Sequence, residues 1–349
     1  MPRTCLEGKR FWPLAAALCA LLLASVTLGV SLGPAPLPFG RVWGVVLHQI
    51  FPGWEAFDRA WPGNEVGIIW QIRLPRVLLG AVVGAGLATA GTVIQAMVRN
   101  SLADPYLLGI SSGACAGAVL VILFAHRLFG GASAFGVSLT AFAGASLAFC
   151  LVSAIARRGN GLTPVRMTLA GLAVSYIFMA AANLMVYMSQ HNGAESAMFW
   201  MLGGLGGARW DRLGLPFAVT LLCLAVFILR ARDLNALLLG DETAAALGVD
   251  VAGFRRVLFV LTSLLTGVLV AVSGSIGFVG LIVPHAARLM IGADHRRILP
   301  VGALAGAVFL IWADVLSRTV LAPRELPLGI VTGFTGAPFF IWLLGRDKH

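Results

Sequence analysis

The fold of this chain is decided by the stretch RLPRVLLGAVVGAGLATAGTVIQAMV, residues 73–98. After the second arginine of this stretch, the run 77–98 contains no Asp, Glu, Lys or Arg. A helix needs about 20 mostly apolar residues to cross the hydrocarbon core of a bilayer. The run therefore predicts a membrane-spanning helix.

The same apolar character extends over all 349 residues, because 59% of them are hydrophobic, only 11% are charged, and the mean hydropathy is +0.91. A soluble domain carries roughly 25% charged residues, so a large soluble domain is excluded. We predict a single all-α integral membrane domain over 1–349. Its ten transmembrane helices are expected at about 11–32, 77–98, 106–125, 135–156, 167–188, 214–229, 257–273, 276–291, 301–316 and 327–344.

The first apolar run has a signal peptide as its alternative interpretation, because basic residues precede it. The apolar core of a signal peptide is usually about 7–15 residues long and is followed by a small-residue cleavage site. The run 11–32 is longer, and no such site follows it. We expect this segment to remain as the first span.

The distribution of Lys and Arg predicts the orientation in the bacterial inner membrane. Ten spans place both termini on one side, and the larger share of the 25 basic residues falls on that side. Cytoplasmic segments carry the excess of Lys and Arg, so both termini are predicted to be cytoplasmic. Topology then explains the net charge of +10 without nucleic-acid binding. Residues 34–72 become an outer, periplasmic loop, and 231–255 become a cytoplasmic loop.

Asp, Glu, Lys and Arg are missing from the interiors of the predicted spans. Ion-coupled transporters usually keep such residues at membrane depth, so a secondary transporter is disfavoured but stays open as an alternative. The five cysteines show no metal-ligand spacing, and no His, Asp or Glu cluster falls at one membrane depth. We therefore expect no metal site and no catalytic residue, although an integral membrane enzyme is the third alternative.

Small residues recur along several predicted spans at helix-packing spacing. Such residues let helix backbones approach closely in lipid, which predicts a tightly packed bundle and a solute path between two subunits. They are Gly80, Gly84, Ala88, Gly91, Gly274, Gly277, Gly280, Gly302, Gly306, Gly329 and Gly333.

A glycine-rich stretch, FWMLGGLGGARW at 199–210, follows the fifth predicted span. It predicts a loop or half-helix that enters from the outer side, since irregular backbone at membrane depth is tolerated where it is buried or lines a cavity. Plain packing is the alternative. The residues predicted to line the pathway are Gly203, Gly204, Gly206 and Gly207.

Five segments in order resemble the permease subunits of ATP-binding-cassette importers for iron chelates and vitamin B12. Together they cover most of the chain from residue 73 onward. They are RLPRVLLGAVVGAGLATAGTVIQAMVRNSLADPYLLGISSGA (73–114), RMTLAGLAVS (166–175), LNALLLGDETAAALGVDV (234–251), SGSIGFVGLIVPHAARLMIGADHRRILP (273–300) and ELPLGIVTGFTGAPFFIWLL (325–344).

The resemblance implies a homodimer with the solute path on its twofold axis, two cytoplasmic ATPase subunits and a periplasmic substrate-binding protein. ATP and Mg belong to the ATPase, and this chain has no G-x-x-x-x-G-K-[ST] run of its own. We expect no cofactor bound by this chain. The solute is expected to contain iron, as haem or a ferric siderophore, with cobalamin open as the alternative.

The resemblance also implies a coupling helix in the polar segment after the sixth span, where the ATPase docks. Gly240 and Asp241 suit the start of a short helix because acids are favoured in the first turn, and Gly248 suits its end. A helix this short is marginal alone and would gain order from a partner. The predicted coupling residues are Leu239, Gly240, Asp241, Glu242, Thr243, Ala244, Leu247 and Gly248.

Two further sites follow from matched positions. Arg73, Arg76 and Arg318 match basic pockets that accept carboxylates of the binding protein, since Arg–carboxylate pairs are directional. The cytoplasmic gate is expected at Asn100, Leu102, Pro164 and Val165. The last two depart from the vitamin B12 permeases, which have small hydroxyl residues there, so the gate would close with apolar side chains.

Overall fold

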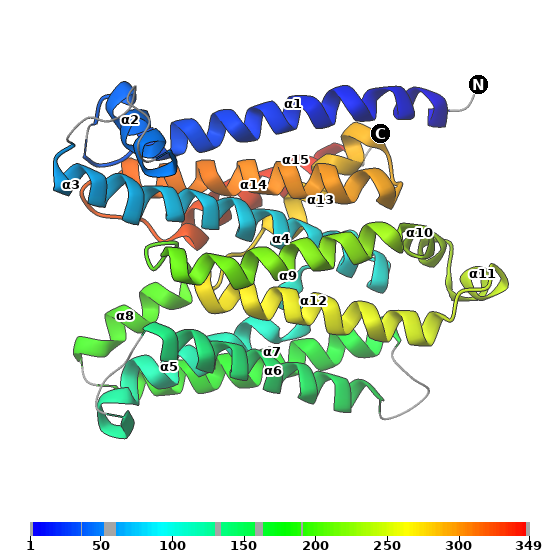
Figure 1. The fold of residues 1–349 in the computed structure, drawn as a ribbon. Coiled ribbons are helices and arrows are strands. Elements are labelled where there is room, and N and C mark those ends of the chain that lie inside the picture. Colours follow the sequence, from blue (N-terminus) through cyan, green and yellow to red (C-terminus); the bar gives the residue numbers. More distant parts are fainter. Residues whose placement is uncertain are drawn as a thin grey trace.

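The computed structural model describes residues 3–35, 37–51, 61–129, 134–157, 163–189 and 191–346. Every regular element in these residues is a helix, and most helices run side by side in one bundle (Figure 1). The helices α2, α3 and α8 lie at one end of the bundle, which we call the α8 end. The helices α10 and α11 lie at the opposite end, which we call the α11 end. The predicted topology makes the α8 end periplasmic and the α11 end cytoplasmic.

The helices follow one another with short connections. They are α1 (Arg3–Ser31), α2 (Phe39–Ile50), α3 (Gly63–Val66), the π-helical η1 (Gly67–Arg73), α4 (Leu74–Val98), the 3-10 helix η2 (Pro105–Leu108), α5 (Ile110–Phe129), α6 (Ala134–Arg157), α7 (Pro164–Met188), α8 (His191–Met201), α9 (Trp210–Leu229), α10 (Ala231–Leu238), α11 (Asp241–Ala246), α12 (Val251–Ser273), α13 (Val279–Ile291), α14 (His295–Thr319) and α15 (Leu328–Arg346).

Each of the ten predicted spans overlaps one of these helices. Within the described residues, seven helical segments are long and apolar enough to cross a bilayer, and three more are apolar but shorter. The three short ones cover 110–124, 279–291 and 328–339. Seven membrane helices are therefore established by length and composition, while the full count of ten stays a prediction.

The segment 34–72, expected to be a loop, is largely helical where the structure describes it. Residues 36 and 52–60 of it lie outside the described residues. Helix α2 buries Val42, Val45 and Val46, whose spacing places them on one side of the helix. They join an apolar cluster with α1 and α4. The second span also begins earlier than predicted, because α3 and η1 lead into α4 without a break.

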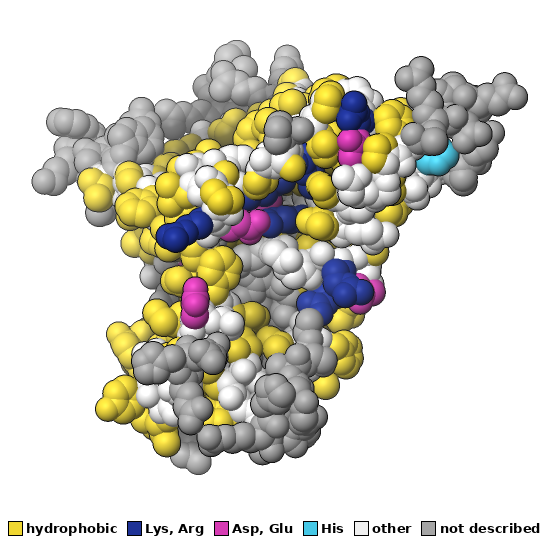
Figure 2. Space-filling view, turned by 90° about the vertical axis from the view of Figure 1, so that its left-hand side faces the viewer, with side chains coloured by type: hydrophobic (Ala, Val, Ile, Leu, Met, Phe, Trp, Pro, Cys, Tyr) yellow, Lys and Arg dark blue, Asp and Glu magenta, His cyan; other side chains and the backbone are white. Residues whose placement is uncertain are grey.

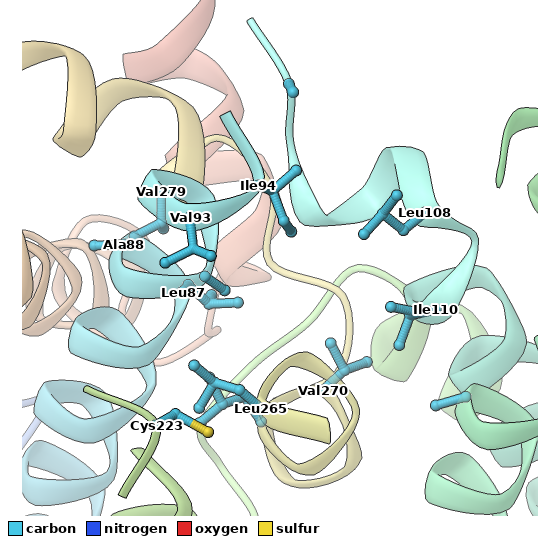
Figure 3. Packing of buried hydrophobic residues seen from close by; sticks show 14 of the residues in the cluster. Leu87, Ala88, Val93, Ile94, Leu108, Ile110, Cys223, Leu265, Val270 and Val279 are labelled. Carbon is cyan, nitrogen blue, oxygen red and sulfur yellow. The ribbon is translucent and has the colours of Figure 1, made fainter. Parts of the chain in front are cut away.

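Helix α4 is the core of the bundle and packs against α14, α12, α13 and α9. Its glycines allow two close crossings: a Cβ atom built on Gly84 would stand 2.1 Å from the carbonyl oxygen of Gly306, and one on Gly91 would stand 2.1 Å from that of Gly280. Larger apolar side chains fill the space beside these crossings (Figure 3). The predicted tight packing is confirmed at these positions.

Not every predicted packing glycine makes such a contact. A Cβ atom on Gly302 would meet nothing closer than the Thr92 hydroxyl at 3.8 Å, and Gly277 and Gly333 have nothing within 4 Å. Spacing along one helix therefore identifies the side that carries small residues, but the crossing point selects which of them the neighbouring backbone touches.

Candidate functional site

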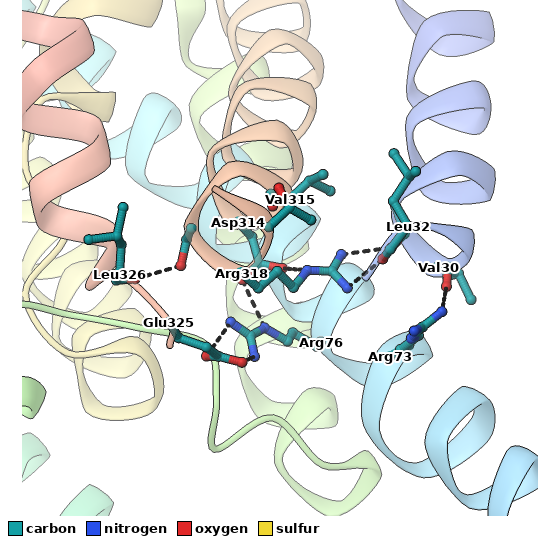
Figure 4. Close-up of polar contacts among 12 residues, drawn as sticks. Val30, Leu32, Arg73, Arg76, Asp314, Val315, Arg318, Glu325 and Leu326 are labelled. Carbon is teal, nitrogen blue, oxygen red and sulfur yellow. Dashed lines mark hydrogen bonds and ion pairs between the residues drawn. The ribbon is translucent and has the colours of Figure 1, made fainter. Parts of the chain in front are cut away.

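A buried ion-pair network occupies the α8 end of the bundle (Figure 4). Arg76, in the first turn of α4, donates through Nε to Asp314 Oδ1 at 2.8 Å. Its two terminal nitrogens donate to the carboxylate of Glu325 at 2.9 and 3.0 Å. Asp314 is 1% exposed in its side chain, whereas Glu325 is 36% exposed. Arg76 thus joins α4 to α14 and to the connection before α15.

Arg318 lies one helical turn beyond Asp314 on α14, and its Nε stands 3.0 Å from Asp314 Oδ2. Its terminal nitrogens donate to the carbonyl oxygens of Leu32 and Gly29 at 2.9 and 2.7 Å. These oxygens belong to the end of α1, where helix carbonyls have no partner inside the helix. The arginine therefore caps α1 from a neighbouring helix.

Arg73, the last residue of η1, donates hydrogen bonds to the same end of α1. Its Nη1 donates to the carbonyl oxygens of Val30 and Ser31 at 3.3 and 3.0 Å, and its Nη2 donates to that of Ala35. The carbonyls that end α1 thus receive hydrogen bonds from two buried arginines.

These contacts involve Arg73, Arg76 and Arg318, the three residues that the resemblance matches to basic pockets for the binding protein. All three are buried in this structure, at 3%, 6% and 2% exposure. The physical reason is the supply of internal acceptors, which neutralise or solvate each guanidinium group. Figure 2, which faces the α8 end, shows charged side chains of both signs across a hollowed surface. A docking role stays a prediction, and it would require these arginines to exchange internal partners for external ones.

The glycine-rich stretch forms a turn between α8 and α9, in which Gly203 and Leu205 are buried whereas Gly206 and Gly207 are exposed. The structure places Gly204, Gly206 and Gly207 on the wall of a cavity of about 560 Å³ that is also lined by Glu195 and Arg212. Gly203 is not on that wall.

Gly203 instead packs in the interior with a left-handed φ of 75°, and a Cβ atom there would stand 2.5 Å from the carbonyl oxygen of Ser275. Only glycine fits such a position without strain. The pathway interpretation stays a prediction for all four glycines, of which Gly203 is the one packed against neighbouring backbone.

Main-chain hydrogen bonds tie this turn to two other helices. The amide of Gly204 donates to the carbonyl of Ser273 at the end of α12. The amides of Leu328 and Gly329, at the start of α15, donate to the carbonyls of Gly203 and Leu202. The backbone groups of this turn are therefore paired with the end of α12 and the start of α15, where helix groups lack partners inside their own helix.

At the α11 end, the predicted coupling helix is present as α11, and we call residues 239–248 the coupling segment. Gly240 precedes the helix with a φ of 110°, and Gly248 follows it with a φ of 86°, so both predicted boundaries are confirmed. Ala244 faces inward and is fully buried, while Leu239 and Leu247 are 65% and 63% exposed. Two large apolar side chains therefore stand open beside Glu242 and Thr243, which are also exposed.

Asp241 is held from within the chain. Arg255, near the start of α12, donates two hydrogen bonds to its carboxylate at 3.1 and 2.9 Å, and Arg99 lies 3.8 Å away. The hydrogen bonds from Arg255 hold the pKa of the Asp241 carboxyl below its ordinary value. The charge of Asp241 is thus used to join the coupling segment to α12 and to the end of α4. Glu242 is exposed, and no ion pair joins it to another of the described residues.

Three of the four predicted gate residues, Asn100, Leu102 and Val165, are exposed at the α11 end. Leu102 is 51% exposed and Val165 is 68% exposed. Asn100 accepts a hydrogen bond from the amide of Leu102, which is a turn contact, and Pro164 occupies the first position of α7. Among the described residues, no hydrogen bond or ion pair joins the two predicted halves, so the gate stays a prediction.

Two polar groups of the interior were not predicted. Asp104, between α4 and η2, is buried and accepts hydrogen bonds from the amides of Tyr106 and Phe278. Burial raises the pKa of its carboxyl to about 6. Gln95 on α4 donates to the carbonyl of Gly280 at 3.0 Å and accepts from Arg288 on α13. The available signal was Gln95 itself, a polar side chain within an apolar span.

In the described part of the chain, no three His, Cys, Asp or Glu side chains gather in a way that could hold a metal ion.

Comparison with known proteins identifies the family. Residues 21–346 match the FecCD transport family. The chain is 40% identical to the hemin transport system permease protein HmuU of Yersinia pestis, covering 94% of each chain. It is 40% identical to the cobalamin import system permease protein BtuC of Halobacterium salinarum, covering 96% of each chain. It is 36% identical to the iron(3+)-hydroxamate import system permease protein FhuB of Bacillus subtilis, covering 96% of this chain and 83% of that one.

A solved structure agrees with this assignment. The fold matches a structure described as an inward-facing conformation of a metal-chelate type ABC transporter, with a TM-score of 0.81 and 30% identity. The match covers 96% of this chain and 99% of that chain. Sequence and fold thus lead to the same conclusion: the chain belongs to the FecCD transport family.

Proposed function

We propose that this chain is the permease subunit of an ATP-driven importer that moves an iron chelate, haem or a ferric siderophore, from a periplasmic binding protein into the cytoplasm. The family and the multi-pass helical fold support the permease role. Relatives named for hemin and iron(3+)-hydroxamate support an iron chelate. A cobalamin importer is the second candidate, because a cobalamin permease is as similar as the hemin one.

The main structural support for the proposal comes from the coupling segment. A short helix stands at the α11 end with Leu239 and Leu247 exposed. Exposed apolar groups of this kind mark a site for a protein partner. We assign them to a groove of a cytoplasmic ATPase, one on each of two permease copies, and ATP and Mg belong to that partner. The permease itself catalyses no reaction.

The solute path is proposed to run between two copies of this chain. Close crossings such as Gly84 against Gly306 leave little room inside the bundle around α4. The cavity beside Gly206 lies instead at the α8 end, where a delivered solute would enter. The gate residues at the other end would then meet their counterparts across the twofold axis.

The test is reconstitution of the permease with its ATPase and binding protein in proteoliposomes. Haem, a ferric hydroxamate and cobalamin are supplied separately, and uptake is measured with ATP and with a non-hydrolysable analogue. We expect ATP-dependent uptake of one iron chelate. Uptake of cobalamin alone selects the second candidate, and uptake that follows an ion gradient without ATP overturns the proposal.

The docking claim has its own test. Replacing both Leu239 and Leu247 by Asp is expected to abolish co-purification of the ATPase. The matched control is Leu321→Asp, at a residue 55% exposed that follows α14 at the opposite end. Equal ATPase recovery from both variants would refute the assignment.

A further inference from the structure

A groove lies between α9 and α12 where both helices reach the α11 end. Its volume is about 600 Å³. Its walls are mainly apolar, and they include Phe227, Leu229, Val257 and Leu261. Leu229 is 81% exposed and Val257 is 50% exposed, so the groove opens on the outside of the bundle. It is separate from the cavity at the α8 end.

The mouth of this groove carries two arginines. Arg230 follows the last residue of α9, and its guanidinium carbon lies 5.0 Å from the centre of the Phe254 ring, a distance typical of cation–π contact. Its Nε also pairs with Asp233 at 2.5 Å, and its side chain remains 54% exposed. Arg256 is exposed, and no ion pair joins it to another residue in the described part of the chain.

One carboxylate also faces the mouth. Asp250 accepts a hydrogen bond from the amide of Gly253 at 3.0 Å and caps the start of α12. The charged groups at the mouth are therefore Arg230, Arg256 and Asp250, and Arg230 is also paired with Asp233. Arg256 is exposed and forms no ion pair with another of the described residues, so an anionic group at the mouth can pair with it.

The position of the groove determines the class of ligand. Helices α9 and α12 are both long enough and apolar enough to span a membrane, and this groove joins their apolar sides to arginines at their ends. Basic pockets between membrane helices bind phospholipid headgroups. A small water-soluble anion would leave the walls at Leu229 and Val257 uncovered, whereas an acyl chain would cover them.

We propose that the groove binds a diacyl phospholipid of the adjoining leaflet, with its phosphodiester on Arg230 and Arg256 and one acyl chain along the walls. The bound lipid lies directly beside the start of α12, which Asp241 ties to the coupling segment through Arg255. The site depends on membrane insertion of the chain and is independent of which solute is transported.

The experiment is native mass spectrometry of the detergent-purified full chain titrated with phosphatidylglycerol. Each charge-assisted hydrogen bond to the phosphodiester is expected to change the affinity by about tenfold. The double variant R230Q/R256Q is therefore expected to bind at least about tenfold more weakly. The matched control R232Q/R296Q removes two exposed arginines of the same end and is expected to bind as the native chain does.

Two further arms separate headgroup from chain recognition. Diacylglycerol, which lacks the phosphate, is expected to bind the native chain about as weakly as phosphatidylglycerol binds the R230Q/R256Q variant. Val257→Trp fills the groove without changing charge and is expected to weaken binding to the native chain, which keeps the test decisive even if the double variant fails to fold. Unchanged phosphatidylglycerol binding by Val257→Trp, or equal binding of both lipids by the native chain, would overturn the proposal.

Discussion

The two glycines of α14, Gly302 and Gly306, lie one helical turn apart and provide a matched test of how the bundle is packed. A Cβ atom on Gly306 would stand 2.4 Å from the carbonyl oxygen of Gly84 and 2.7 Å from the Cβ of Ala88. A Cβ atom on Gly302 would meet only the Thr92 hydroxyl, at 3.8 Å. Replacing each glycine by alanine therefore adds the same methyl group to two different environments.

The expected free-energy changes have opposite signs. Cβ contacts shorter than 3.0 Å are essentially never seen, so α14 and α4 must separate at Gly306, and overpacking of this kind typically costs about 1–3 kcal/mol. At Gly302 the methyl group fits. Alanine there restricts the unfolded chain and is expected to stabilise by about 0.4–1 kcal/mol.

The assay is thermal unfolding of both variants in the same detergent, followed by tryptophan fluorescence. Gly306→Ala is expected to unfold several degrees below the native chain, and Gly302→Ala at or slightly above it. The reasoning would be refuted by equal destabilisation of the two variants, because a general intolerance of α14 to alanine would then explain both. It would also fail if Gly306→Ala were as stable as the native chain.

Three further substitutions test the charged groups. Asp241→Asn leaves Arg255 without its ionised partner, so solute uptake per ATP hydrolysed should fall severalfold in proteoliposomes. The control Glu242→Gln changes an exposed acid and should not lower this ratio. An equal loss in both variants would count against a role of the Asp241–Arg255 ion pair. Asp314→Asn leaves two buried arginines facing each other. Since breaking a buried ion pair costs about 3–5 kcal/mol, its unfolding temperature in detergent should drop by several degrees, and an unchanged value would contradict the network. The raised pKa of Asp104, about 6 against roughly 4 in an unfolded chain, means that the native state retains a proton which the unfolded state releases. Unfolding free energy should therefore fall as pH rises from about 4 to 6, and Asp104→Asn should remove this dependence in melts across that range.

The helical segments could be predicted because an apolar run of sufficient length has few alternatives in lipid. The boundaries of α11 could also be predicted, because Gly240 and Gly248 end the helix through their own backbone conformation, which depends only on nearby residues. Helix α2 was missed because its buried valines form a short amphipathic pattern inside a segment that matched the family poorly. The extent of a long apolar run was therefore easier to predict than the structure of the segment before it.

Partners distant in sequence could not be predicted. Arg76 and Asp314 are 238 residues apart, and no local pattern links them. The chain therefore gave no sign that the arginines of the α8 end would be buried on internal acceptors. The same limit applies to Asp241, whose bond to Arg255 depends on how the coupling segment folds back onto α12.

The turn at 202–204 bears on which substitutions the neighbouring cavity can accept. Its links to α12 and α15 are made by amides and carbonyls, and these groups are common to nearly all residue types. The side chains around the neighbouring cavity, among them Glu195, Phe199 and Arg212, are not part of those links. Substitutions of these side chains can therefore change the chemistry of the cavity while the backbone links between the turn, α12 and α15 stay the same.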